Sequence, residues 1–148
     1  MRRFVNPGDT AFEVAVNSQI YVDKTGLLAY TNSVINTKQA LICSSRPRRF
    51  GKSITADMLC AYYSRGCDSD SIFASYEIAK SDSYKKYLNQ YDVIYLDIQW
   101  CMMDAGSAEQ TVSYLNYHVI EELKEIYPQI LPDGIRTAYG AMSCINAQ

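Results

Sequence analysis

The sequence lacks the features that mark several special classes of protein. No apolar run approaches the ~20 residues that a membrane helix needs, and the residues from Met1 to Asp9 lack the apolar core of a signal peptide. The five cysteines form no CxxC pair, and histidine and tryptophan occur once each. With 20% charged and 48% hydrophobic residues, the chain of 148 residues has an ordinary globular composition. These features exclude an integral membrane protein, a disulfide-rich miniprotein and a disordered chain, and they predict a cytoplasmic protein with reduced thiols and no membrane partner.

The net charge of the chain is -2, but the charged residues are unevenly distributed along it. Residues 1–60 carry a net charge of +4, and residues 61–148 carry a net charge of -6. Half of the basic residues in the first part lie between Arg46 and Lys52. Such a tight cluster indicates a local anion-binding site rather than a broad surface for nucleic acid, although a solvated basic loop has the same composition.

Two segments have the composition of buried β-strands. Residues 39–44 (QALICS) are mainly apolar, and residues 91–98 (YDVIYLDI) are dominated by β-branched and aromatic side chains. A shorter β-prone stretch at residues 20–22 precedes a tripeptide at 23–25 (DKT). This tripeptide has two interpretations, a helix cap and a contact to a ligand.

Helices are expected after each of these strands. Apolar residues repeat at helical spacing over residues 52–63 and again over residues 112–126, and Pro128 must end the second helix. A further helix is expected to begin at Ile135. The alternation of strands and helices predicts an α/β protein with a mainly parallel sheet flanked by helices.

The strongest chemical signal lies where the first predicted strand meets the helix that follows it. The segment from Arg46 to Ser53 reads RPRRFGKS, and its last three residues match the phosphate-binding template G-x-x-x-x-G-K-[ST]. Arg46 occupies the position of the template's first glycine, which departs from the general pattern. The segment predicts a loop that binds phosphate groups.

Each residue type in the matching triplet suits phosphate binding. Gly51 lets the backbone approach an anion closely, and the amides at the start of the following helix point toward that anion. Lys52 adds a full charge, worth about 4 kcal/mol at 4 Å for an effective dielectric constant of 20, before its desolvation is counted. The hydroxyl of Ser53 suits a magnesium ion that bridges two phosphates.

The segment from Arg46 to Ser53, together with residues 21–25 (YVDKT), resembles the bacterial AAA-ATPase-like family. The resemblance continues through residues 71–73, 76–78 and 88–94 and covers nearly the whole chain. The family's own loop has arginine at the position of the first glycine, so Arg46 fits the family pattern. Members of this family commonly carry a nuclease-like domain of the PD-(D/E)xK type after the ATPase domain.

The resemblance implies a fold of the P-loop NTPase type, with ATP as the ligand and Mg²⁺ as the cofactor. It implies Gly51, Lys52 and Ser53 as phosphate-loop residues, and we expect Ser53 to hold the metal through its hydroxyl. The residues that we predict for nucleotide binding are Arg46, Pro47, Arg48, Arg49, Phe50, Gly51, Lys52, Ser53 and Ile54.

We expect one domain over residues 1–148, made of a lead-in segment (1–38) with the YVDKT motif and a P-loop core (39–148). In the family, the Walker B strand with its hydrolytic Asp-Glu pair follows a helix comparable to residues 135–146. We therefore expect the chain to be the amino-terminal part of an ATPase, without its hydrolytic half. Further copies of the chain or a downstream nuclease-like domain are the expected protein partners.

Asp97 has two interpretations. It follows an apolar run, as a Walker B carboxylate that holds Mg²⁺ would, but Ile98 and Gln99 stand where an adjacent glutamate would be needed to activate water. The alternative is a polar residue at the end of a strand.

The other polar residues of the second half are expected to be structural. His118 stands beside the apolar stripe of its helix, which favours a structural or exposed position. Glu121, Glu122 and Glu125 are expected on the solvated side of the same helix.

Three functions remain open from the sequence. The first is an ATP-binding domain that lacks its hydrolytic half. The second is a complete small nucleotide hydrolase that uses Asp97 as a metal ligand. The third is a nucleic-acid-binding module that uses the cluster from Arg46 to Arg49, and the net negative charge of the chain disfavours it.

Overall fold

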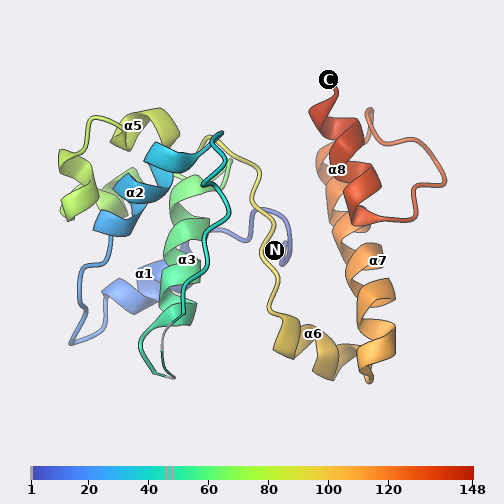
Figure 1. Ribbon diagram of the computed structural model, residues 1–148, viewed down its shortest axis with the longest axis horizontal. Coiled ribbons are helices and arrows are strands. Elements are labelled where there is room, and N and C mark those ends of the chain that lie inside the picture. Colours follow the sequence, from blue (N-terminus) through green and yellow to red (C-terminus); the bar gives the residue numbers. More distant parts are fainter. Residues whose placement is uncertain (1, 46, 48) are drawn as a thin grey trace. The chain divides into compact units, whose positions relative to one another are not determined.

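The computed structural model describes residues 2–45, 47 and 49–148, and their regular structure is helical. The chain divides into two compact units, which we call the 6–93 unit and the 94–148 unit, the latter including residues 2–5 (Figure 1). The 6–93 unit contains α1 (Thr10–Val16), α2 (Gly26–Val34), α3 (Lys52–Tyr63), α4 (Asp70–Phe73), the 3-10 helix η1 (Glu77–Lys80) and α5 (Tyr84–Tyr87). The 94–148 unit contains α6 (Ile98–Ala105), α7 (Ala108–Ile126) and α8 (Ala138–Asn146). No helix within these described ranges is long and apolar enough to cross a membrane.

The prediction of a P-loop NTPase fold with a mainly parallel sheet flanked by helices is wrong for the part of the chain that the structure describes. Residues 39–44 form no strand, and Leu41 within them is 96% exposed. Residues 91–97 contain two isolated β-bridges, from Tyr91 to Ser64 and from Ile94 to Val5, and no continuous strand.

The physical reason is that a strand needs a neighbouring strand to pair with its N–H and C=O groups. The composition of residues 91–98 predicts extended backbone but does not specify the partner, and Ile98 is instead the first residue of α6. Here the backbone of this segment bonds to other parts of the chain. The amide of Tyr91 donates to the Tyr63 carbonyl at the end of α3 at 2.9 Å, and the amide of Tyr95 donates to the Phe4 carbonyl at 2.8 Å.

The predicted helices are confirmed in their main features. Helix α3 has the predicted bounds, and α7 contains the whole of the predicted segment 112–126. The Ser107 hydroxyl caps α7 by accepting the Gln110 amide at 3.3 Å, and the helix ends before Pro128. Helix α8 begins a few residues after Ile135, where the hydroxyl of Thr137 accepts the Gly140 amide at 3.1 Å.

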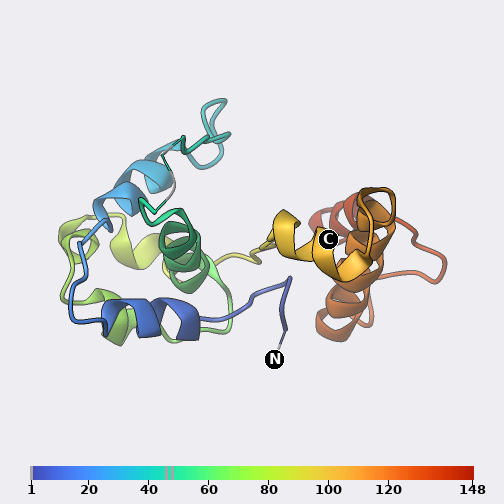
Figure 2. The ribbon, with the colours of Figure 1, turned by 90° about the horizontal axis from the view of Figure 1, so that it is seen from below.

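The core of the 6–93 unit forms around α3, which lies beside α1 in both views (Figures 1 and 2). Tyr62 of α3 is fully buried and packs edge-on against Phe73 of α4, with 5.4 Å between the ring centroids. Phe73 in turn stacks on Phe12 of α1 at 5.1 Å. Three helices that are short or moderate in length are thereby joined through one aromatic cluster.

A buried polar network connects α2 to α3. The side-chain amide of Asn32 donates to the Tyr62 hydroxyl at 3.0 Å, and its carbonyl oxygen accepts from the Tyr63 hydroxyl at 2.6 Å. The Tyr62 hydroxyl itself donates to the Tyr84 carbonyl at 2.8 Å. Burial raises the pKa of Tyr63 to about 12, so its hydroxyl stays protonated and can serve as a donor.

Asn89 holds the carboxyl end of α3. Its side-chain amide donates to the carbonyls of Ala61 at 3.0 Å and Ser64 at 3.1 Å, two acceptors at the end of the helix. Its carbonyl oxygen accepts the Ser69 amide at 3.2 Å, which fixes the loop that leads to α4. The end of α3 is therefore tied to segments both before and after α4.

The 94–148 unit packs α7 against α6, α8 and the amino-terminal residues. Val119 and Leu123 of α7 are buried in one cluster with Cys101 of α6 and Ala141 of α8. His118 stacks on the ring of Phe4 at 5.9 Å between centroids, which gives it a structural position as expected.

Glu122 was expected on the solvated side of α7, and the structure corrects this expectation. Its carboxylate accepts the backbone amides of Arg3 at 2.8 Å, Phe4 at 2.9 Å and Val5 at 2.7 Å. A helical periodicity cannot reveal this role because the three donors lie more than a hundred residues earlier in the chain. Glu122 anchors the amino-terminal segment to α7.

We expect Glu122→Ala to lower the free energy of unfolding by about 1.5–3 kcal/mol, because three amides lose a charged acceptor. Glu125→Ala is the matched control, since Glu125 lies one turn later on the same helix and is exposed. Urea denaturation of both variants measures the difference. Equal stabilities of the two variants would contradict the anchoring role.

Candidate phosphate-binding site

The backbone turns sharply where the phosphate-loop segment (residues 46–53) enters α3. Gly51 is the N-cap residue of α3 and has left-handed dihedral angles, φ 75° and ψ 30°. Arg49, two residues earlier, is also left-handed with φ 68°. The Gly51 carbonyl accepts both the amide of Thr55 at 2.9 Å and its hydroxyl at 3.0 Å, which fixes the first turn of α3 on this glycine.

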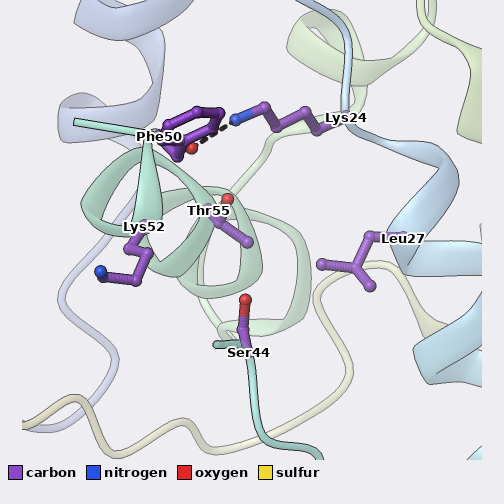
Figure 3. Close-up of a pocket in the computed structure, with 6 residues that line it drawn as sticks. All are labelled: Lys24, Leu27, Ser44, Phe50, Lys52 and Thr55. Atoms are coloured by element: carbon purple, nitrogen blue, oxygen red, sulfur yellow. Dashed lines mark hydrogen bonds between the residues drawn. The ribbon is translucent and has the colours of Figure 1, made fainter. Parts of the chain in front are cut away.

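Two lysines approach this turn. The Lys24 ammonium donates to the Phe50 carbonyl at 2.8 Å, and the Lys52 ammonium donates to the Pro47 carbonyl at 3.4 Å. Figure 3 shows Lys24 reaching Phe50 from the side of α2, while the Lys52 side chain points away from Lys24. Both lysines line one pocket of about 310 Å³. Its lining residues are Lys24, Leu27, Ser44, Phe50, Lys52 and Thr55.

The residues on either side of Lys24 hold it in place. The Asp23 carboxylate accepts the Thr25 amide at 2.8 Å and the Glu77 amide at 3.0 Å, and the buried Thr25 hydroxyl accepts the Ile78 amide at 3.2 Å. Partial burial alone would raise the pKa of Asp23, but the two amide donors lower it below the ordinary value. Asp23 therefore stays ionised and keeps the turn before α2 attached to η1.

The structure brings several of the sequence-predicted residues to the start of α3. Phe50 and Lys52 line the pocket, and Gly51 forms the turn between them. Ser53 and Ile54 follow on the exposed first turn of the helix. Pro47 and Arg49 are exposed, and Pro47 contributes a carbonyl to Lys52. Arg46 and Arg48, which were predicted to bind nucleotide, lie outside the described residues.

Lys24 is the site residue that sequence reasoning did not assign. The 23–25 tripeptide was interpreted either as a helix cap or as a ligand contact. Thr25 does stand at the N-cap position of α2, but its hydroxyl bonds to η1 and not to α2. The signal that pointed to Lys24 was the YVDKT motif, which accompanies the loop in the resembling family. Leu27, Ser44 and Thr55 carried no comparable signal.

Asp97 has a structural role in the other unit. It is the N-cap residue of α6, and its carboxylate accepts the Trp100 amide at 3.0 Å. A metal role for Asp97 stays a prediction. The described residues contain no group of three or more His, Cys, Asp or Glu side chains that could hold a metal ion.

The arrangement at the start of α3 is suited to binding an anion. A left-handed residue followed by right-handed helical residues directs successive backbone N–H groups to one point. The first amides of a helix have no acceptor within the helix, and the helix dipole favours negative charge there. Two ammonium groups beside the same turn add full positive charges. This combination can hold a phosphate group.

Comparison with protein families agrees with these features. A family model described as Predicted AAA-ATPase matches residues 10–141, most of the chain. The chain belongs to the AAA-ATPase-like family. The match includes Lys24, the phosphate-loop segment and α3. Searches of curated proteins and of solved structures gave no match for this AAA-ATPase-like protein.

We expect Gly51→Ala to lower the stability of this AAA-ATPase-like protein by about 1–2 kcal/mol, because a side chain is disfavoured at left-handed angles. It should also displace Lys24, since a β-carbon at position 51 would lie 2.9 Å from the Lys24 ammonium. The expected result is weaker binding of pyrophosphate in a calorimetric titration.

Gly66→Ala separates these two effects. Gly66 is also left-handed, with φ 89°, but a β-carbon there would meet no atom within 4 Å. This variant should lose similar stability and keep its pyrophosphate affinity. The same affinity in both variants would show that the space beside Lys24 is irrelevant to anion binding.

Proposed function

We propose that this AAA-ATPase-like protein binds ATP, with the phosphates held where residues 50–53 enter α3. The observation that carries the proposal is the left-handed Gly51 at the start of α3, beside a pocket that two lysines line. Membership of a family described as Predicted AAA-ATPase supports ATP as the nucleotide.

The charge of Lys52 should contribute most to phosphate binding. An ammonium 4 Å from a phosphate charge gains about 4 kcal/mol at an effective dielectric constant of 20, before desolvation, and a helix N-terminus adds only about 0.3–1 kcal/mol. Lys52 is exposed, and one of its acceptors is the neutral Pro47 carbonyl at a long distance of 3.4 Å. A phosphate oxygen would be a stronger acceptor because it is charged.

The pocket is large enough for part of a nucleotide. Its volume of about 310 Å³ lies at the lower end of the usual range for small-molecule sites. Leu27 and Phe50 give it apolar surface beside the two ammonium groups. Such a combination of apolar contact and a few charged groups is typical of ligand pockets.

The residues present fit Mg²⁺ as an ion that arrives with the nucleotide. Ser53 is exposed on the first turn of α3, directly after Lys52, and a hydroxyl there suits an ion that bridges two phosphates. Mg²⁺ is usually held by one or two protein groups together with substrate phosphates. Ser53 would hold the ion, which neutralises part of the phosphate charge.

We expect Lys52→Ala to weaken Mg²⁺-dependent ATP binding by about a hundredfold or more, which corresponds to about 3 kcal/mol. Lys38→Ala is the control, because it removes one exposed lysine that does not line the pocket. Isothermal titration calorimetry with ATP and Mg²⁺ measures both. Unchanged ATP affinity in Lys52→Ala would overturn the proposed function.

A second experiment tests the role of Ser53. In wild-type protein, chelation of Mg²⁺ with EDTA should weaken ATP binding. In Ser53→Ala the affinities with Mg²⁺ and with EDTA should become similar, because the hydroxyl ligand is gone, whereas Ser53→Thr should keep the dependence on Mg²⁺. The same Mg²⁺ dependence in Ser53→Ala and wild type would exclude Ser53 as a ligand.

A further inference from the structure

The YVDKT motif places one exposed cation on a firmly held turn. Thr25 is fully buried, and Asp23 and Thr25 together accept three backbone amides, two of them from η1. Lys24 stands between these two residues and is exposed. A turn that is fixed on both sides of an exposed lysine limits the positions that its ammonium can reach.

The ammonium of Lys24 lies beside the glycine of the phosphate-loop segment. It donates to the Phe50 carbonyl at 2.8 Å, and it would be 2.9 Å from a β-carbon at Gly51 (Figure 3). A side chain at position 51 would therefore crowd the Lys24 ammonium at this turn. Lys24 and Phe50 are 26 residues apart in sequence, yet this contact joins the YVDKT motif and the phosphate-loop segment in one site.

The charge of Lys24 is not neutralised by an acidic partner in the described part of the chain. The ion pairs found there do not involve Lys24. The neighbouring Asp23 carboxylate is engaged by the amides of Thr25 and Glu77. An ammonium has three N–H donors, and the Phe50 carbonyl takes one of them. Lys24 can therefore hold the loop and still donate to an anion in the pocket.

We propose that Lys24 is a second phosphate-binding lysine, which holds the Phe50 carbonyl and a phosphate oxygen at the same time. This inference rests on the proposed function and adds a specificity to it. Lys24 and Lys52 line the same pocket but point in different directions (Figure 3). Two separated cations favour a ligand whose negative charge is extended, so the site selects nucleoside triphosphates over nucleoside monophosphates.

The test compares ATP, ADP and AMP binding to Lys24→Met, Lys24→Arg and the control Lys38→Met, by calorimetry in the presence of Mg²⁺. Methionine keeps much of the length of the side chain and removes its charge, whereas arginine keeps a charge and N–H donors. We expect Lys24→Met to weaken ATP binding by about tenfold, which is about 1.4 kcal/mol, and AMP binding by less than about twofold. Lys24→Arg should recover most of the ATP affinity, and Lys38→Met should behave as wild type.

Two results would overturn the role of Lys24. One is wild-type ATP affinity in Lys24→Met. The other is an equal loss for ATP, ADP and AMP, which would mean that Lys24 only supports the loop. The melting temperature of each ligand-free variant is measured beside the titration. A value within a few degrees of wild type establishes that the variant is folded.

The Lys52→Ala variant separates this inference from the proposed function. If Lys52→Ala no longer binds ATP and Lys24→Met binds it as wild type does, the proposed function is supported and the role of Lys24 is contradicted. If wild-type protein binds none of the three nucleotides, the proposed function and the role of Lys24 are both contradicted. A loss of affinity in Lys24→Met that is largest for ATP and smallest for AMP, together with recovered ATP affinity in Lys24→Arg, supports both the proposed function and the role of Lys24.

Discussion

Tyr62 and Tyr63 bring two hydroxyl groups into the core of the 6–93 unit, and each hydroxyl must find a partner there. An unpaired buried hydroxyl would cost about 1–3 kcal/mol. Asn32 of α2 meets this requirement for both tyrosines, and Tyr62 donates onward to the carbonyl of Tyr84. The network therefore fixes α2 against α3. Lys24 precedes α2 and Gly51 precedes α3, so the same network determines how the two parts of the candidate site meet.

Backbone geometry also contributes to the candidate site, because it orients the first amides of α3. Asn89 holds the carboxyl end of α3 through the carbonyls of Ala61 and Ser64, while Gly51 and Thr55 fix its amino end. A helix that is held at both ends keeps its first amides in a constant direction. This rigidity is useful to an anion site, because donors that are already oriented do not have to be ordered when a ligand binds.

The sequence predicted the elements that depend on local patterns. The bounds of α3 follow from helical periodicity and from Gly51 before it, and the end of α7 follows from Pro128. The predicted sheet failed because pairing depends on a partner strand, which composition does not reveal. Residues 91–98 have the composition of a strand, yet the amide of Tyr91 bonds to the end of α3 and the amide of Tyr95 bonds to Phe4.

Long-range contacts explain why the sequence did not predict two further features, the position of Lys24 in the candidate site and the role of Glu122. The loop residues Gly51, Lys52 and Ser53 could be found because they are adjacent in a recognisable motif. Lys24 could not be assigned to them, since nothing local shows that its ammonium reaches the Phe50 carbonyl. Glu122 was wrongly predicted to face solvent, because its three amide partners lie at the other end of the chain.

Asn32 restricts which sequences can form this core. Its side chain donates to Tyr62 and to Ser83 and accepts from Tyr63, so the position requires a donor and an acceptor on one short side chain. Aspartate would retain the acceptor but lose both donated bonds and add a buried charge, and leucine would leave the tyrosine hydroxyls with fewer partners. We therefore expect position 32 to tolerate very few replacements during evolution, although Asn32 does not line the pocket of the candidate site.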